Sequence, residues 1–165
     1  MCTPTNQTPF QTHKKLMQQA LAEARKAFDC DETPVGALLF DTKRQKTIAK
    51  AHNQSQRGQN PLQHAEMLVL QKALTHNKEP YLEAHTLYVT LEPCCLCAAA
   101  ISMARVETLV FGAYNPKGGA VVHGPHLFEN AALSFKPQVI GGVLEQEASK
   151  LLQTFFKQKR PKTVF

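Results

Sequence analysis

The sequence predicts an α/β fold, a three-layer α/β/α sandwich with helices on both faces of a mixed sheet. Short apolar runs typical of strands alternate with helical patterns through the middle of the chain, and this alternation favours parallel strands covered by the helices that join them. The first two apolar runs are separated by a short charged turn, which favours an antiparallel hairpin. Parallel and antiparallel pairs together make the sheet mixed.

The length and composition fit one globular domain. A chain of 165 residues can bury a substantial core, and we assign residues 9–160 to one domain between a flexible N-terminal arm, 1–8, and a C-terminal tail, 161–165. Apolar residues make up 43% of the chain and charged residues 19%, which excludes wholesale disorder. The net charge of +6 favours a polyanionic partner, although many basic proteins bind none.

The sequence also bears on the compartment. No apolar run approaches the roughly 18 residues that a membrane span needs, so we expect no membrane association. The first ten residues lack the basic and apolar regions of a secretory signal and the arginines of a transit peptide. We therefore expect a cytoplasmic, reducing location, where clustered cysteines more often bind metal or catalyse than form disulfides.

The first predicted element is a helix over 9–28. Thr8 can serve as its N-cap, Pro9 suits the first helical position, and Gln11 can reach back to complete a capping box. Apolar residues then recur three or four positions apart, which predicts one buried face.

A hairpin and a second helix follow. The continuous apolar run VGALLF, 35–40, suits a strand covered on both faces, and TIAKAHN, 47–53, is its predicted partner. The polar stretch 54–62 is expected to be a loop. HAEMLVLQKAL, 64–74, contains good helix formers and no breaker, so it predicts a helix.

The second half of the chain contributes three strands and two helices. The strands are predicted over 86–91, 108–113 and 138–143, and the helices over 94–104 and 145–160. The segment 115–125 is rich in Gly and Pro and is expected to be irregular. The crossover out of the strand 108–113 therefore lacks a clear helical pattern.

The stretch LEPCCLC holds three of the five cysteines. Cys94 and Cys97 lie three positions apart at the start of a predicted helix, so both sulfurs can meet one ion. The helix N-terminus stabilises thiolates at this position. Cys95 is turned about 100° from Cys94, and we expect it to be a buried structural cysteine.

His64, in HAE, is the candidate third ligand. Two thiolates and one imidazole suit Zn²⁺ and leave a fourth tetrahedral position for water, whose pKa zinc lowers to about 7. Glu66, two residues beyond His64, is the candidate acceptor for the water proton. In a regular helix these two side chains would point about 200° apart, so their cooperation requires that both flank one pocket at the helix start.

Two other interpretations of the cysteines remain open. The C-x-x-C pair could be a thiol oxidoreductase site, which would carry no stoichiometric zinc. The ion could also be structural in a binding module without catalysis. That interpretation needs a fourth protein ligand, for which the nearby candidates are Cys30, Cys95, His52 and His123.

The combination of H-x-E with P-C-x-x-C about thirty residues later is the signature of zinc nucleobase deaminases. With His64-Ala65-Glu66 and Pro93-Cys94-Cys95-Leu96-Cys97, the chain resembles the tRNA-specific adenosine deaminase family. PVGALL, HN, HAEMLVL, TLYVTLEPCCLCAAAISMARVETLVFGA and FFKQKR look like family segments in family order. The resemblance covers roughly residues 12–160.

The resemblance implies a cytidine-deaminase-like α/β/α fold with a mixed five-stranded sheet and a homodimer. It implies one Zn²⁺ per chain, and a tRNA anticodon stem-loop whose wobble adenosine is hydrolysed to inosine. His64, Cys94 and Cys97 would hold the zinc, and Glu66 would shuttle protons. A deaminase of a free base or nucleoside, of guanine or cytosine type, is the alternative on the same fold.

The resemblance also implies substrate contacts. These would come from Asn53, Asn115, Phe156 and Arg160. Family members often have aspartate where this chain has Asn115, in a loop expected to line the substrate entrance. In the same loop His123 is expected to pack or to form a hydrogen bond rather than to bind metal. The basic residues near Arg160 could instead be a solvated helix end, and of Phe155 and Phe156 one is expected in the core.

Overall fold

The computed structural model describes residues 8–76 and 79–160, so most of the predicted arm and all of the predicted tail lie outside the described residues. The elements are α1 (Pro9–Asp29), β1 (Gly36–Asp41), β2 (Lys46–His52), α2 (Ala65–His76), β3 (His85–Leu91), α3 (Cys95–Met103), β4 (Thr108–Ala113), the 3-10 turn η1 (Leu127–Glu129), β5 (Gln138–Ile140) and α4 (Glu145–Lys159). This order confirms the predicted sequence of helices and strands.

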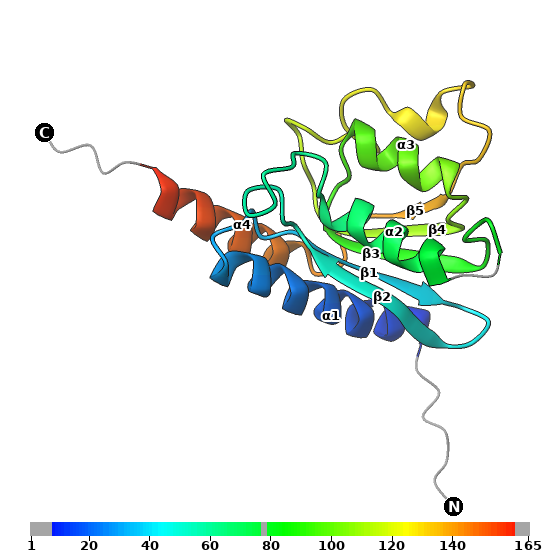
Figure 1. Cartoon of the computed structure of the whole chain (residues 1–165), viewed down its shortest axis with the longest axis horizontal. Coiled ribbons are helices and arrows are strands. Elements are labelled where there is room, and N and C mark those ends of the chain that lie inside the picture. The colour runs from blue at the N-terminus through cyan, green and yellow to red at the C-terminus, as the bar shows by residue number, and fades with distance from the viewer. Residues whose placement is uncertain (1–7, 77–78, 161–165) are drawn as a thin grey trace, which may run out of the picture.

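The sheet has five strands in the order β2-β1-β3-β4-β5. β1 pairs antiparallel with β2 and with β3, whereas β3, β4 and β5 are mutually parallel. Helices α1 and α4 cover one face and α2 and α3 cover the other (Figure 1). The predicted mixed five-stranded α/β/α sandwich is therefore confirmed.

Side chains alternate between the two faces of the central strand β3. Leu87 and Val89 join the core beneath α2 and α3, whereas Tyr88 joins the core beneath α1. This alternation follows from the period of two along a strand. It explains why β3 is apolar throughout, because both of its faces are buried.

The N-terminus of α1 confirms the predicted capping box. The backbone N–H of Gln11 donates to Thr8 Oγ1 over 3.4 Å, and Gln11 Oε1 accepts from the Thr8 N–H over 3.0 Å. The last strand is shorter than predicted, because β5 ends at Ile140. Gly142 then takes a positive φ of 80°, a conformation that ends extended pairing and favours glycine.

One edge of the sheet collects several chain ends that matter for function. β3 ends at Leu91 and β4 at Ala113, and these two residues are paired. β1 begins at this edge, since Ala37 pairs with Val89 near the end of β3, and β2 ends there, since Gly36 pairs with His52. In open α/β sheets, ligands bind beyond the carboxyl ends of the parallel strands, so this edge is the place to seek a site.

Candidate metal centre and substrate pocket

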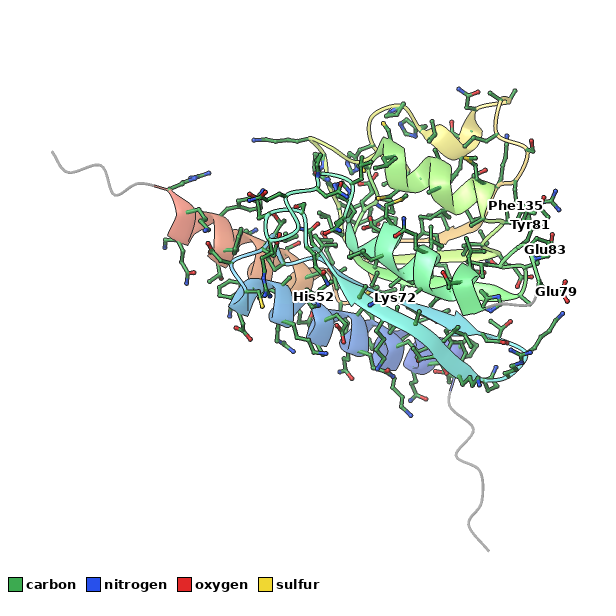
Figure 2. The ribbon with its side chains drawn as sticks, in the orientation of Figure 1. His52, Lys72, Glu79, Tyr81, Glu83 and Phe135 are labelled. Carbon is green, nitrogen blue, oxygen red and sulfur yellow. The ribbon has the colours of Figure 1, made fainter. Side chains whose placement is uncertain are left out.

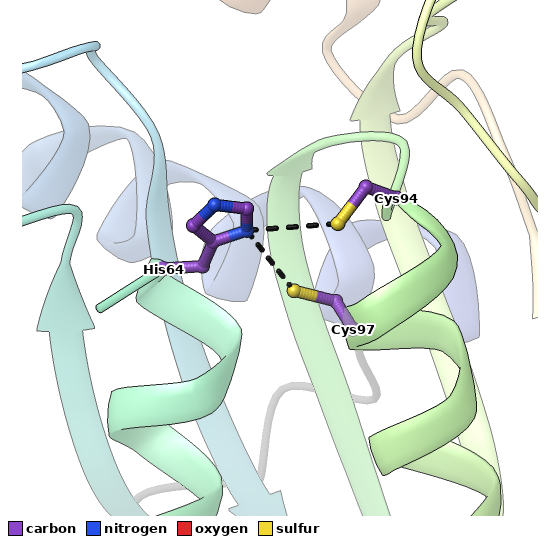
Figure 3. Close-up of side chains that lie close together, drawn as sticks. All are labelled: His64, Cys94 and Cys97. Carbon is purple, nitrogen blue, oxygen red and sulfur yellow. Dashed lines mark hydrogen bonds between the residues drawn. The ribbon is translucent and has the colours of Figure 1, made fainter. Parts of the chain in front are cut away.

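The three predicted zinc ligands meet at this edge. His64 immediately precedes α2, Cys94 is the N-cap of α3, and Cys97 lies in the first turn of α3. His64 Nδ1 lies 3.6 Å from the Cys94 sulfur and 3.4 Å from the Cys97 sulfur. Figure 3 shows both sulfurs facing the imidazole.

The spacing of these atoms suits zinc. A tetrahedral ion with bonds of about 2.3 Å to sulfur and about 2.0 Å to nitrogen separates sulfur from nitrogen by about 3.5 Å. The three ligand atoms all lie within 4.8 Å of one another, so one ion can contact all of them. Among the described residues no fourth His, Cys, Asp or Glu joins this cluster. Such an ion would therefore keep a coordination position for a non-protein ligand.

Without an ion, protons are shared unequally among the three ligands. The hydrogen bond from the Cys97 thiol lowers the pKa of Cys94, and the hydrogen bond from His64 lowers it further, although burial acts in the opposite direction. The bond to Cys94 raises the pKa of His64, and the bond to Cys94 together with burial raises the pKa of Cys97. The site thus already stabilises negative charge on one sulfur.

Glu66 lies in the first turn of α2 and is buried, with only 4% of its surface exposed. Its carboxyl group contacts the Cys97 thiol. Burial raises the pKa of Glu66, and the negative charge on Cys94 raises it further. Because His64 precedes the helix, the 200° separation expected inside a regular helix does not apply, and both side chains line one pocket.

Cys95 was expected to be buried, and this prediction is wrong. Its side chain is exposed, since it lies outside the face of α3 that Cys97, Ala98 and Ile101 bury. The other three candidates for a fourth ligand are engaged elsewhere. Cys30 accepts a hydrogen bond from Arg57, His52 lies beside Glu23, and His123 binds Glu92.

A pocket of about 170 Å³ opens beside the metal ligands. It is lined by Thr33, Val35, Asn53, Ser55, His64, Glu66, Leu91, Glu92, Cys94 and Asn115. Of the predicted substrate contacts, Asn53 and Asn115 lie here. The structure therefore places both asparagines in the same pocket as Glu66 and two of the three predicted zinc ligands.

One wall of the pocket is held by Glu32, which has no exposed surface. Its carboxylate accepts hydrogen bonds from Asn53 Nδ2 over 3.0 Å and from the backbone N–H groups of Gln56 and Arg57 over 3.1 and 2.6 Å. These bonds tie the loop after β2 to the end of α1.

The opposite wall is held by Glu92. Backbone N–H groups of Asn115, Val121, Val122 and His123 donate to its carboxylate. Burial by itself would raise the pKa of Glu92, but these bonds and the bond from the His123 ring lower it. A Cβ atom at Gly119 would lie 2.5 Å from the Glu92 carboxyl carbon, so glycine permits the close approach. His123 thus has the predicted hydrogen-bonding role.

Phe156 and Arg160 lie in a different place. Together with Lys117, Leu152, Gln153, Lys157 and Lys159 they line a larger hollow of about 850 Å³ along α4. Phe156 is 49% exposed, whereas Phe155 is buried, as expected of one of the pair. The structure therefore divides the predicted substrate residues between a small pocket at the metal ligands and a basic surface on α4.

Two further hollows, of about 250 and 190 Å³, lie at the end of the molecule opposite α4 and share Tyr81. Figure 2 shows Tyr81, Glu83 and Phe135 in this region. None of the predicted site residues lines either hollow. The described helices also include none with the length and apolarity required to cross a bilayer.

Sequence reasoning missed Glu32 and Glu92 as parts of the site. Glu92 immediately precedes the Pro-Cys motif, and Glu32 lies three residues before Val35. Their burial comes from loops that close over them, which no periodic pattern indicates. A single acidic residue next to an apolar strand or motif was the available signal.

Comparisons with known proteins identify relatives of this chain. Residues 10–113 match the family described as "Cytidine and deoxycytidylate deaminase zinc-binding region". The tRNA-specific adenosine deaminase of Bacillus subtilis is 42% identical over 146 residues, which span 88% of this chain and 89% of that protein.

Solved structures give a consistent result. A chain from a study of A-to-I editing by tRNA:A34 deaminases at the wobble position of transfer RNA is 40% identical, with a TM-score of 0.79, and the match covers 84% of this chain and 99% of that one. A guanine deaminase from Nitrosomonas europaea is 21% identical with a TM-score of 0.71 over 93% of this chain and 96% of that one, and this likeness shows the fold alone. This chain belongs to the tRNA-specific adenosine deaminase family.

Proposed function

We propose that this protein hydrolyses adenosine to inosine at the wobble position of a tRNA anticodon and that it requires zinc. One observation carries the proposal: His64, Cys94 and Cys97 converge at a pocket that also contains the buried carboxyl of Glu66. The similarity to tRNA-specific adenosine deaminases over most of the chain supports adenosine in tRNA as the substrate.

The roles of the residues follow from their chemistry. Zinc, when bound, makes water acidic enough to serve as a nucleophile near neutral pH. Glu66, whose raised pKa suits proton transfer, would accept a proton from the attacking water and deliver protons to the base and the leaving amine. Water is consumed and ammonia is released, so the C6 amino group of adenine is replaced by oxygen. We propose one zinc ion per chain.

The shape of the site supports a single-stranded target. A pocket of about 170 Å³ lies between two loops, and a base inside a duplex must leave its stack to enter such a pocket. An anticodon loop offers unpaired bases at lower cost. The hollow on α4 joins the exposed ring of Phe156 to Lys157, Lys159 and Arg160, a combination that suits stacking and phosphate contacts.

We also propose a homodimer built on α3. This helix contains no charged residue, and it exposes Leu96 at 38% and Met103 at 76%. Such an apolar face next to the metal ligands suits a contact between copies of the chain. If so, Met103→Glu should shift the sedimentation coefficient to that of a monomer, whereas Leu74→Glu on α2, a similar exposed apolar position, should leave it unchanged. A wild-type chain that sediments as a monomer would contradict the dimer.

Two further parts of the proposal concern context. Residues 9–160 act as one deaminase domain, because the metal ligands, both asparagines and α4 all lie within it. A cytoplasmic location is proposed from the tRNA substrate.

A panel of substrates tests the proposed reaction. Zinc-loaded protein is incubated separately with an anticodon stem-loop that carries a wobble adenosine, and with free adenosine, guanine and cytosine. We expect inosine in the stem-loop and little product from the free compounds. Ammonia released from a free base, without inosine in the RNA, would show instead that the protein is a deaminase of small molecules.

A further inference from the structure

We propose that Glu32 is a positioning residue that fixes the Asn53 carboxamide with its oxygen toward the substrate, and that this oxygen accepts a hydrogen bond from the ribose 2′-hydroxyl of the edited nucleotide. The proposal rests on the proposed function and adds to it a residue that makes the site selective for ribose.

The contacts of Asn53 fix which end of its amide faces the pocket. Asn53 Nδ2 lies 3.0 Å from Glu32 Oε2 and 3.0 Å from Ser55 Oγ, so both amide hydrogens have acceptors. Glu32 also accepts two backbone N–H groups, which orients its oxygens as acceptors. If the amide were flipped, the Asn53 oxygen would lie against a carboxylate oxygen, and the two would repel.

The remaining polar atom of this side chain is accessible. No hydrogen bond to Asn53 Oδ1 occurs within the described part of the chain, and no fully buried side-chain oxygen there lacks a partner. Because Asn53 is 95% buried and lines the pocket with His64 and Glu66, the accessible surface of Oδ1 belongs to the pocket. The pocket therefore offers a fixed acceptor that a substrate donor can reach.

The chemistry of a nucleotide within RNA limits which donor this can be. The ring nitrogens of adenine at positions 1, 3 and 7 are acceptors, and the 3′ and 5′ oxygens of an internal nucleotide are esterified. The exocyclic amine is the group that leaves at the metal ligands and Glu66. The 2′-hydroxyl is the donor that remains, and it is the group by which a protein distinguishes RNA from DNA.

A double comparison of protein and substrate tests the proposal. Stem-loops carrying either adenosine or 2′-fluoroadenosine at the wobble position are deaminated by the wild type, Glu32→Gln and Ser55→Ala. Fluorine preserves the sugar pucker but cannot donate. We expect the wild type to lose about tenfold in kcat/KM with the fluoro substrate, the size of one buried hydrogen bond.

The variants separate orientation from general damage. In Glu32→Gln the side-chain amide can donate to Asn53, so the carboxamide can turn, and we expect the loss with the fluoro substrate to shrink to about twofold or less. Ser55→Ala keeps the Glu32 contact and should keep the tenfold loss. Asn53→Ala removes the acceptor, so it should also abolish the discrimination between the two sugars. This variant tests the Asn53 contact even if Glu32→Gln proves too unstable to assay.

The outcomes are distinguishable from failure of the proposed function. If the wild type deaminates the adenosine and the fluoro stem-loops at equal rates, this inference is overturned while the proposed function stands. A full tenfold loss retained in folded, zinc-loaded Glu32→Gln would overturn the role of Glu32. If the adenosine stem-loop is not deaminated at all, the proposed function fails and this inference fails with it.

Discussion

The ring Nδ1 of His123 lies 2.8 Å from Oε2 of Glu92, a carboxylate with only 1% of its surface exposed. This contact joins the loop after β4 to the segment that carries Cys94. Glu92 in turn accepts four backbone N–H groups from the same loop. The wall of the pocket that contains Asn115 is thus anchored two residues from Cys94, one of the proposed zinc ligands.

Removing the Glu92 charge should destabilise this wall. Glu92→Gln replaces one acceptor oxygen with an NH₂ group that faces N–H donors, and we expect a loss of about 2–4 kcal/mol in the free energy of unfolding. His123→Ala should cost about 1 kcal/mol, because that ring is partly solvent-exposed. Urea denaturation of zinc-loaded protein measures both.

His123→Asn and His126→Asn serve as controls for this loop. Asparagine can place a donor where His123 Nδ1 lies, so His123→Asn should recover most of the stability lost in His123→Ala. His126 is half exposed, and its φ of 47° is tolerated by asparagine. If Glu92→Gln were as stable as the wild type, the hydrogen bonds to Glu92 would not stabilise this loop.

The neighbouring cysteines should behave differently. Cys94→Ala, Cys97→Ala and His64→Ala each remove one member of the cluster and should lower zinc to well below one ion per chain. Cys95→Ala removes an exposed sulfur between them and should retain zinc. Metal analysis of reduced, dialysed protein provides the measurement. Loss of zinc from Cys95→Ala, or full zinc in Cys97→Ala, would contradict the assignment.

The basic hollow on α4 should contribute to RNA affinity. Lys157→Gln and Arg160→Gln each remove a charge from this surface, so each should raise KM for the stem-loop several-fold and reduce the salt slope of binding by about 0.7–0.9. Lys43→Gln, at the β1–β2 turn, removes a charge far from α4 (Figure 1) and should change neither quantity. If all three variants had the same effect, RNA affinity would depend on the net charge of the protein and not on the surface of α4.

Stability should fall at high pH because of Tyr88. Burial raises its pKa to about 12, above the value near 10 of an unfolded tyrosine. The folded state holds this proton more tightly, so the stabilisation is complete below pH 10 and is lost as the pH rises toward 12. The loss approaches about 2–3 kcal/mol. Tyr88→Phe should reduce the dependence of unfolding free energy on pH in this interval, and an unchanged dependence would contradict the shift.

The fold and the convergence of His64, Cys94 and Cys97 could be predicted because their signals are local. A capping box, a hairpin and apolar runs of strand length each depend on residues close in sequence, as Thr8 with Gln11 illustrates. The convergence of His64 with Cys94 followed from two motifs and the topology that brings the starts of α2 and α3 to one edge.

The rest depends on contacts that no periodicity encodes. Glu32 and Glu92 are buried by loops whose paths are set by the hydrogen bonds themselves. Cys95 was misassigned because its angular position on α3 excludes it from the metal site but does not show whether it faces the core or solvent. The separation of Phe156 from the small pocket likewise depends on where α4 packs against the sheet.

Glu66→Ala is the decisive variant, because it separates metal binding from catalysis. Inosine formed at the wobble position of the stem-loop is measured by mass spectrometry for wild type and variant, each normalised to its zinc content. We expect zinc near one per chain in both proteins and a fall of about a thousandfold or more in inosine formation by Glu66→Ala. A variant that loses its zinc, or one that keeps zinc and still forms inosine at the wild-type rate, would contradict this expectation.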